Sequence, residues 1–420
     1  MIKRVAKKIK EYGIYLSFLR FLKKINYKII SIINIFERKH IWKHSKDYKE
    51  LKSIITDKKY KTVFIFHPFV IWNLPAFQRP QQIASALAKE KDVLYIYCTP
   101  DSEKDKFCGL FKKISSNLIL TVDYEFVERI KRPNKVVQFY STNVGFNYKV
   151  VETALKYKNK VLYEYIDGID KDLLGKIPKY YIERHKKVMS NENIFVIASA
   201  DKLIKDVKKY RKNNFALVCN GVVLSDFKSN IKKPPQELEK IKKEYDKVVC
   251  YYGALASWFD YELLKKCAKK YPEYAFILIG IDFDETLEKS GVLDNKNVFY
   301  LGKVKYNELI NYTKFTDLLT IPFVINHITE STSPVKLFEY MATQKPILTT
   351  AMPECKKYMS AIIGENHDDY VEKIEVAIKL ANDKEYLKTE MIEAEQNTWE
   401  SKAKEILDLI NTEEQHETND

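Results

Sequence analysis

The stretch LLTIPFVINHITESTSPVKLFEYMATQKPILTT, from Leu318 to Thr350, contains a complete strand–helix–strand unit. Leu318–Pro322 and Ile347–Thr350 are short apolar runs of the kind that forms buried parallel strands. Between them Ser333 precedes Pro334, and proline suits the first position of a helix because its missing N–H costs nothing there. The stretch therefore predicts one βαβ unit of a doubly wound α/β domain.

The same alternation of strand runs and helical patterns covers most of the chain. It pauses at Asn220-Gly221, a turn signal, and restarts after the Lys232–Pro235 stretch, which reads as a connection between domains. We therefore predict an α/β fold with two Rossmann-like domains facing a cleft at the carboxyl ends of both sheets. The other expected strands are Val63–His67, Val93–Tyr97, Leu118–Val122, Val136–Tyr140, Val161–Ile166, Ile194–Ala198, Ala216–Cys219, Val248–Tyr252, Ala275–Gly280 and Val298–Leu301.

Positive charge is concentrated at one end of the chain. Residues 1–60 carry 17 Lys and Arg against 5 Asp and Glu, whereas the remaining residues carry 54 against 52. A nearly neutral body argues against binding along a nucleic-acid backbone. The predicted segments are a basic amphipathic extension (1–60), a first domain (61–228), a linker (229–246), a second domain (247–395), a helix returning toward the first domain (396–411) and an acidic tail (412–420).

The extension has the pattern of a helix that lies on a membrane surface. Its apolar run from Ile25 to Phe36 is interrupted by polar residues and is too short to span a bilayer. A basic face opposite an apolar face favours an anionic leaflet, although a helix packed on the protein body is the alternative. The apolar arc comprises Ile14, Phe18, Phe21, Leu22, Ile25, Ile29, Ile32, Ile33 and Phe36, and the basic arc comprises Arg20, Lys23, Lys24 and Lys28.

Residue types that hold metals or redox cofactors occur without a recognisable spacing. The six cysteines form no CxxC pair, the seven histidines form no HxH or HExxH, and no GxGxxG or Walker A run is present. Two Asp-x-Asp triplets, Asp170/Asp172 and Asp282/Asp284, are of a kind that arises by chance in a chain rich in aspartate. We expect no metal and no cofactor. The absence of a signal-peptide pattern favours a cytoplasmic location.

The start of the predicted helix at Pro334 is suited to binding an anion. Free backbone N–H groups and the helix dipole would attract a diphosphate, and Lys336 adds a positive charge one turn in. The spacing equally fits a capped surface helix in which Lys336 and Glu339 form an ion pair. Both interpretations remain open from the spacing alone.

The Leu318–Thr350 stretch resembles the donor-site signature of glycosyltransferase family 4 and its relatives of the GT-B fold, including bacterial enzymes that make teichuronic acid or capsular polysaccharide. The likeness covers residues 61–411. Segments that agree in the same order are FQRPQQIASALA (Phe77–Ala88), LYEYIDGID (Leu162–Asp170), IASADKL (Ile197–Leu203), NGVVLSDF (Asn220–Phe227), YYGALASWFDYELL (Tyr251–Leu264), FILIG (Phe276–Gly280), NVFYLGKVKYNEL (Asn297–Leu309) and NTWESKAKEIL (Asn397–Leu407).

The resemblance implies a nucleotide-sugar site on the loop and helix from Asn326 to Tyr340. In the family, the second glutamate of a Glu-x7-Glu motif holds the ribose hydroxyls, and Glu339 occupies its place. Ser331 stands where the first, sugar-binding glutamate is expected, with Glu330 one position away. Gln344 replaces the glycine that normally follows the helix. The other donor-site residues that the resemblance implies are Thr332, Ser333, Pro334, Gly253 and Gly302.

The charge on the leaving group needs a partner other than the one that is usual in the family. The Arg and Lys pair of the family is absent from Gly253–Leu264. The expected substitutes are the helix N-terminus, Lys336 and Arg79. Asp167 follows a strand near the place where relatives put a polar residue close to the anomeric carbon, and it would orient the acceptor hydroxyl or simply form a turn.

The first domain is expected to bind the acceptor. Trp72, Arg79 and Gln81 come after its first strand, at the predicted mouth of the cleft. Loops in that position commonly meet acceptor and phosphates in the GT-B fold. The alternative is that Trp72 only packs against its neighbours and Arg79 only starts a helix.

These features together predict a metal-independent glycosyltransferase. It would move a sugar from a nucleotide-sugar to a glycan acceptor, lipid-linked, in the synthesis of bacterial surface polysaccharide such as capsule, and the resemblance implies retention of anomeric configuration. Its partners would be the donor, a glycan or polyprenyl-linked acceptor and the anionic inner face of the cell membrane, with no nucleic acid. The alternatives are a sugar-nucleotide epimerase of the GT-B fold and an inactive sugar-binding scaffold.

Overall fold

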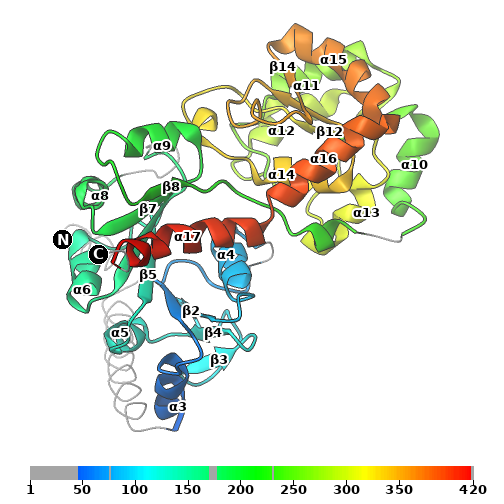
Figure 1. Ribbon diagram of the computed structural model, residues 1–420. Helices are drawn as coiled ribbons and strands as arrows, with labels where there is room; N and C mark the ends of the chain where they lie inside the picture. Colours follow the sequence, from blue (N-terminus) through cyan, green and yellow to red (C-terminus); the bar gives the residue numbers. More distant parts are fainter. Residues whose placement is uncertain (1–45, 75–76, 170–176, 229–230, 418–420) are drawn as a thin grey trace, which may run out of the picture.

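The computed structural model describes residues 46–74, 77–169, 177–228 and 231–417, which form two α/β domains (Figure 1). The amphipathic pattern at residues 14–36, the Asp170/Asp172 triplet and the end of the acidic tail lie outside these residues. Within the described part, no helix is long and apolar enough to cross a membrane.

The first domain is built on an eight-stranded sheet of order β3-β4-β2-β1-β5-β6-β7-β8, in which β3 pairs antiparallel with β4 and the other pairs are parallel. Its strands are β1 (Thr62–Phe66), β2 (Val93–Cys98), β3 (Phe111–Lys113), β4 (Leu118–Thr121), β5 (Lys135–Tyr140), β6 (Lys160–Tyr165), β7 (Ile194–Ala198) and β8 (Phe215–Leu217). Its helices are α3 (Lys46–Ile55), α4 (Arg79–Leu87), α5 (Tyr124–Arg129), α6 (Tyr148–Lys156), α8 (Lys179–Ser190), α9 (Asp201–Val207) and the 3-10 turn η1 (Leu224–Phe227).

Helices cover both faces of this sheet, so its strands are apolar throughout their length. Helices α3, α5, α6, α8 and α9 contribute to the core on one face. Helices α4 and α17 (Trp399–Glu417) cover the other face. Leu51 and Ile55 of α3 are fully buried in the core, so this end of the predicted 1–60 extension is part of the first domain.

The second domain has a six-stranded parallel sheet of order β11-β10-β9-β12-β13-β14. Its strands are β9 (Lys247–Tyr252), β10 (Tyr274–Ile279), β11 (Val298–Tyr300), β12 (Leu318–Ile321), β13 (Ile347–Thr350) and β14 (Ala361–Gly364). Its helices are α10 (Gln236–Glu244), α11 (Tyr261–Lys270), α12 (Thr286–Ser290), α13 (Ile310–Thr313), α14 (Val335–Thr343), α15 (His367–Lys379) and α16 (Lys384–Gln396), with 3-10 turns η2 (Val292–Asp294), η3 (Tyr306–Glu308), η4 (Thr329–Ser331) and η5 (Leu380–Asn382).

All twelve expected strands are present, with ends shifted by no more than two residues. The short edge strands β3 and β14 were not expected, because three or four residues are too few to show a pattern. Most of the expected linker 229–246 is helix α10, which buries Leu238 and Ile241 in the second core. Its charged residues lie on the solvent face of an amphipathic helix.

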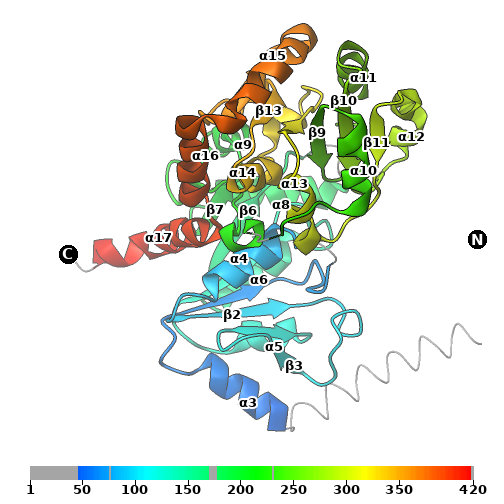
Figure 2. The ribbon, with the colours of Figure 1, turned by 90° about the vertical axis from the view of Figure 1, so that its right-hand side faces the viewer.

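The chain passes between the domains twice, and the two crossings run side by side (Figure 2). Val222 forms a parallel bridge with Thr398, and its N–H donates to the Asn397 carbonyl at 3.0 Å. A Cβ on Gly221 would lie 2.9 Å from that same carbonyl oxygen, so only glycine allows this approach. From this point α17 returns to the first domain and packs against α4.

Candidate active site

The predicted anion-binding helix is α14, which begins at Val335, one residue later than expected. Ser333 does not cap it, because the hydroxyl oxygen of Ser333 accepts from the N–H of Asn220 (3.4 Å) and its carbonyl accepts from the Asn220 side-chain amide (2.7 Å). Pro334 occupies the N-cap position and has no hydroxyl to offer. The first N–H groups of α14, at Val335 and Lys336, therefore lack an acceptor within the helix. This helix start retains the donors that an anion needs.

Lys336 extends over the end of β9, where a missing side chain makes room for it. A Cβ at Gly253 would lie 1.8 Å from Cε and 2.6 Å from Nζ of Lys336. The ammonium lies 5.7 Å from the ring centroids of both Tyr251 and Phe323, and burial lowers its pKa. Within the described residues it has neither a hydrogen bond nor an ion pair. A half-buried cation without a partner is suited to an anionic ligand.

Three glycines follow β9, β10 and β11, which are neighbouring strands of the second sheet. Gly253 and Gly280 have φ values of +145° and +149°, and a Cβ on Gly280 would lie 1.8 Å from the Gly253 carbonyl oxygen. Gly302 faces open space, with nothing within 4 Å of an added Cβ. The main chain is therefore exposed along this edge beside Lys336, where a nucleotide could approach closely.

Glu339 is buried one turn further along α14. Its carboxylate accepts from the Tyr252 hydroxyl at 3.0 Å. Burial raises the carboxyl pKa, opposed by the charge of Lys336 and by hydrogen bonds from Tyr252 and Tyr306. The ion pair with Lys336 that the spacing allows is not formed: Glu339 points to Tyr252, and Lys336 points to Gly253. The alternative of a simple surface ion pair is thus excluded.

The loop before α14 lies against the first domain. Ser331 donates to the His327 carbonyl at 2.9 Å, and its Oγ lies 3.7 Å from where a Cβ of Gly168 would be. Thr332 donates to the Ile328 carbonyl at 3.0 Å. Both hydroxyls hold the loop, and Ser331 lies where this loop meets the residues that follow β6.

Glu330 is engaged across the domains. Its carboxylate pairs with the Lys202 ammonium at 2.9 Å, and the same ammonium donates to the His327 carbonyl. Lys202 belongs to α9 of the first domain. The expected role of Glu330 in binding the donor sugar is replaced here by a contact between the domains.

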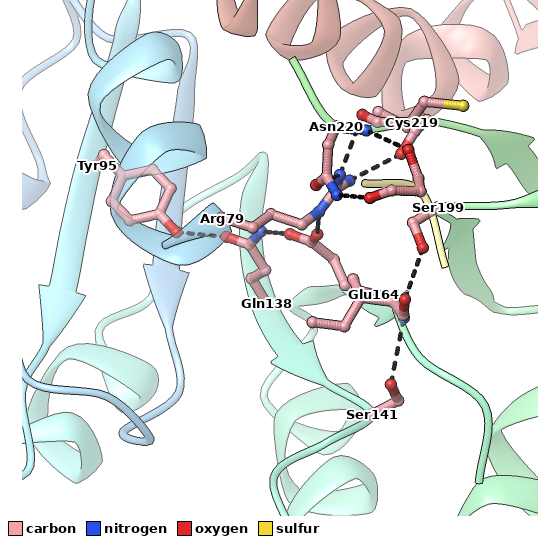
Figure 3. Close-up of polar contacts among 11 residues, drawn as sticks. Arg79, Tyr95, Gln138, Ser141, Glu164, Ser199, Cys219 and Asn220 are labelled. Carbon is pink, nitrogen blue, oxygen red and sulfur yellow. Dashed lines mark hydrogen bonds and ion pairs between the residues drawn. The ribbon is translucent and has the colours of Figure 1, made fainter. Parts of the chain in front are cut away.

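Asp167 is half-buried next to Gly168, close to Ser331. Burial raises the pKa of its carboxyl to about 6, although the nearby Arg79 charge acts in the opposite direction. The chain just before it is held from both sides, since the Ile166 N–H donates to the Ser141 hydroxyl (3.3 Å) and the Ser199 hydroxyl donates to the Ile166 carbonyl (2.6 Å; Figure 3). The structure thus brings Asp167 and the Ser331 loop together from opposite domains.

Arg79 is not available to a leaving group. It forms a buried ion pair with Glu164 at 2.6 Å, and its other nitrogens donate to the Val218 and Cys219 carbonyls and to the Asn220 side chain (Figure 3). Every nitrogen of the guanidinium is engaged, and its side chain is 5 % exposed. The prediction that Arg79 takes part in catalysis is therefore corrected: Arg79 fastens α4 to the start of the first crossing.

Trp72 and Gln81 are also interior residues. Trp72 packs on Phe77 and Tyr97, and its N–H donates to the Asp105 carboxylate at 3.0 Å. Gln81 is fully buried, and its amide donates to the Ile71 carbonyl at 2.8 Å. The expectation that these two side chains face the acceptor is corrected, because packing and hydrogen bonds hold both inside the first domain.

Two contributors were not singled out from the sequence. Tyr252 ends a buried strand and reads as core, although its hydroxyl orients Glu339. Asn220 was noted only as a turn, yet it joins Arg79 to Ser333. Asp282 and Asp284 accept from backbone N–H groups of Ser257 and of α12, so they act as caps.

Comparison with known families places the second domain. Residues 232–405 match the family model described as "Glycosyl transferases group 1". A curated protein of Bacillus subtilis (strain 168), "Putative teichuronic acid biosynthesis glycosyltransferase TuaH", is 22% identical over 241 residues. That match spans 54% of this chain and 60% of the relative, so the likeness extends over rather more than half of each protein.

Comparison with solved structures gives the same fold over most of the chain. An α,α-trehalose-phosphate synthase (UDP-forming) from Burkholderia vietnamiensis matches with a TM-score of 0.62 at 13% identity, covering 84% of this chain and 99% of that one. Anabaena Alr3699/HepE in complex with UDP and glucose matches with a TM-score of 0.59 at 11% identity, covering 84% and 100%. At such identities the likeness is one of fold, and the fold is GT-B.

Proposed function

Because residues 232–405 match the group 1 glycosyl transferases in a chain with the GT-B fold, we propose that this protein is a glycosyltransferase. It moves a sugar from a nucleotide-sugar to a glycan acceptor. The observation that carries this proposal is the unpartnered Lys336 ammonium, poised over Gly253 beside the open start of α14. A nucleoside diphosphate has the charge and shape to occupy this place.

The donor lies along α14 in this proposal. Its diphosphate accepts from the N–H groups of Val335 and Lys336 and contacts the Lys336 ammonium. Its ribose hydroxyls donate to Glu339, whose carboxylate Tyr252 holds in position. The base meets the exposed main chain near Gly302. The sugar then points toward Ser331, where the two domains meet.

The chemistry follows from this placement. Negative charge develops on the diphosphate as the bond to the sugar breaks, and fixed donors at a helix start stabilise that charge without reorganising. No metal is needed in this scheme because Lys336 and the helix dipole supply the positive charge. Asp167 lies on the acceptor side and orients the attacking hydroxyl. That hydroxyl attacks on the face from which the diphosphate leaves, with retention of configuration.

The acceptor and the cellular setting are also proposals. The similarity to TuaH supports a role in the synthesis of a bacterial surface polysaccharide, such as capsule or teichuronic acid. The basic arc of the 1–60 extension supports a place at the inner face of the membrane, where a lipid-linked acceptor would be presented.

The donor site is tested by removing one charge at a time from adjacent carboxylates. Glu339→Gln should weaken binding of the best-bound nucleotide among UDP, GDP, dTDP and CMP by roughly tenfold or more, because a charge-assisted hydrogen bond to ribose is lost. Glu330→Gln is the matched control, since Glu330 pairs with Lys202 and should leave the affinity unchanged. The measurement is isothermal titration calorimetry. Equal affinities for wild type and Glu339→Gln would refute the assignment.

A further inference from the structure

An open pocket lies at the edge of the first sheet where β1 and β5 end. These strands are neighbours, and the helices that follow them lie on opposite faces: α4 follows β1 and α6 follows β5. The order of connections reverses there, which is where open α/β sheets bind ligands. The pocket has a volume of about 390 Å³ and is lined by His67, Gly145, Phe146, Asn147, Val150 and Tyr180.

The lining carries no charge at neutral pH. Burial, aided by the charge of Arg184, lowers the pKa of His67 to about 4, so the imidazole is neutral. His67 is fixed between the rings of Tyr124, Phe139 and Phe146, whose centroids lie 4.8–5.0 Å away. A pocket of this kind does not suit a phosphate, which seeks cations.

Tyr180 presents an aromatic surface to this pocket. Its side chain is 44% exposed, yet its hydroxyl donates to the Val144 carbonyl at 2.7 Å, which fixes the ring. The side-chain oxygen of Asn147 caps α6 by accepting from Lys149, which leaves its amide N–H groups for another acceptor. A fixed aromatic face with neutral polar groups around it suits a ligand that is apolar on one side and rich in hydroxyls at its rim. A neutral sugar ring has that character.

The pocket shares an edge of the sheet with Asp167. Strands β1, β5 and β6 are consecutive in the sheet, so their ends are spaced by about 5 Å each and the pocket lies about 10 Å from the end of β6. Ser141 links the two places, since its hydroxyl accepts from Ile166 and its carbonyl accepts from the Tyr181 hydroxyl at 2.7 Å. That separation exceeds one hydrogen bond, so a sugar in the pocket is not the one whose hydroxyl meets Asp167.

We propose that this pocket is a saccharide subsite that holds a neutral sugar of the acceptor beyond the sugar under attack. The acceptor is then a glycan of at least two residues. This inference rests on the proposed glycosyltransferase function, which it deepens by assigning the acceptor class.

The test uses the full chain and ligand-observed saturation-transfer NMR with lactose, cellobiose and N,N′-diacetylchitobiose at about 10 mM each. We expect wild type to bind at least one of them. Tyr180→Ala should weaken that binding at least tenfold, and Val150→Trp, which fills the pocket, should abolish it. Tyr180→Phe should retain most of it because the ring remains.

Tyr210→Ala is the matched control, because Tyr210 is a similarly exposed tyrosine (38%) elsewhere in the first domain and should leave saccharide binding unchanged. Thermal unfolding of each variant checks that it is folded. Absence of binding by wild type, or equal binding by wild type, Tyr180→Ala and Val150→Trp, would overturn the subsite. Nucleotide titration of the same samples reports separately on the donor site, so failure of the proposed function is distinguishable from failure of the subsite.

Discussion

At the scale of single residues, the second domain contains a carboxyl group that works against its own stability. Glu390 on α16 is fully buried. Burial, together with the nearby charge of Glu393, raises its pKa to about 9, opposed by a hydrogen bond from Tyr386 and the charge of Lys345. At neutral pH the folded chain therefore binds a proton at Glu390 that the unfolded chain releases.

This proton makes stability depend on pH in a defined direction. Between the unfolded pKa of about 4.3 and the folded value the native state holds more protons, so stability falls as pH rises. Glu390→Gln cannot ionise and should unfold with a free energy roughly 1–3 kcal/mol higher than wild type at pH 8, with little difference at pH 5. The exposed Glu395→Gln on the same helix is the control. Denaturant titrations at both pH values measure this, and an equal difference at pH 5 and pH 8 would contradict it.

At the scale of elements, α14 shows how much of the site was legible beforehand. Lys336 and Glu339 were predictable because a helix start, a lysine and a carboxylate have meaning at short range. The ends of the helix were less so. Ser333 looked like a cap but is held by Asn220, 113 residues away, and no local pattern reveals such a partner. Arg79 was misassigned for the same reason, since Glu164 neutralises it from another strand.

The other end of α14 carries strain. Gln344 follows the helix with φ of +54°, in the left-handed region that favours glycine. Gln344→Gly should raise the free energy of unfolding by about 0.5–1 kcal/mol, because relief of strain exceeds the added entropy of the unfolded chain. Gln344→Ala keeps a Cβ and should bring no gain. Thermal unfolding of the three chains checks this, and a glycine variant less stable than the alanine variant would count against it.

At the scale of the whole molecule, the α/β architecture was predictable because buried parallel strands are apolar along their length and alternate with helices. The division into domains was harder to place. Helix α3 was assigned to the extension, and α10 was assigned to a linker, since their charged faces dominate their composition. What composition cannot show is the single buried stripe, Leu51 and Ile55 or Leu238 and Ile241, that joins each helix to a core.

The membrane proposal belongs to this scale. Reversing Arg20, Lys23, Lys24 and Lys28 to glutamate in the full chain should abolish cosedimentation with phosphatidylglycerol vesicles, because the attraction to an anionic surface is lost. Reversing Lys232, Lys233, Lys240 and Lys243 changes the net charge equally and should have little effect. Binding by wild type should also weaken in about 1 M salt. If the two variants cosediment equally, the extension is not the anchor.

The paired crossings have a mechanical consequence. Two chain segments joined by a bridge between Val222 and Thr398, with Gly221 packed against the second, bend together like the knuckles of one hinge pin. Rotation about that pin is the motion they oppose least, whereas twisting would shear their hydrogen bonds. Asn220 lies beside the pin and holds both Arg79 and Ser333. A ligand that settles at the start of α14 therefore presses on the pivot itself, and the opening angle of the two halves becomes a property that the donor sets.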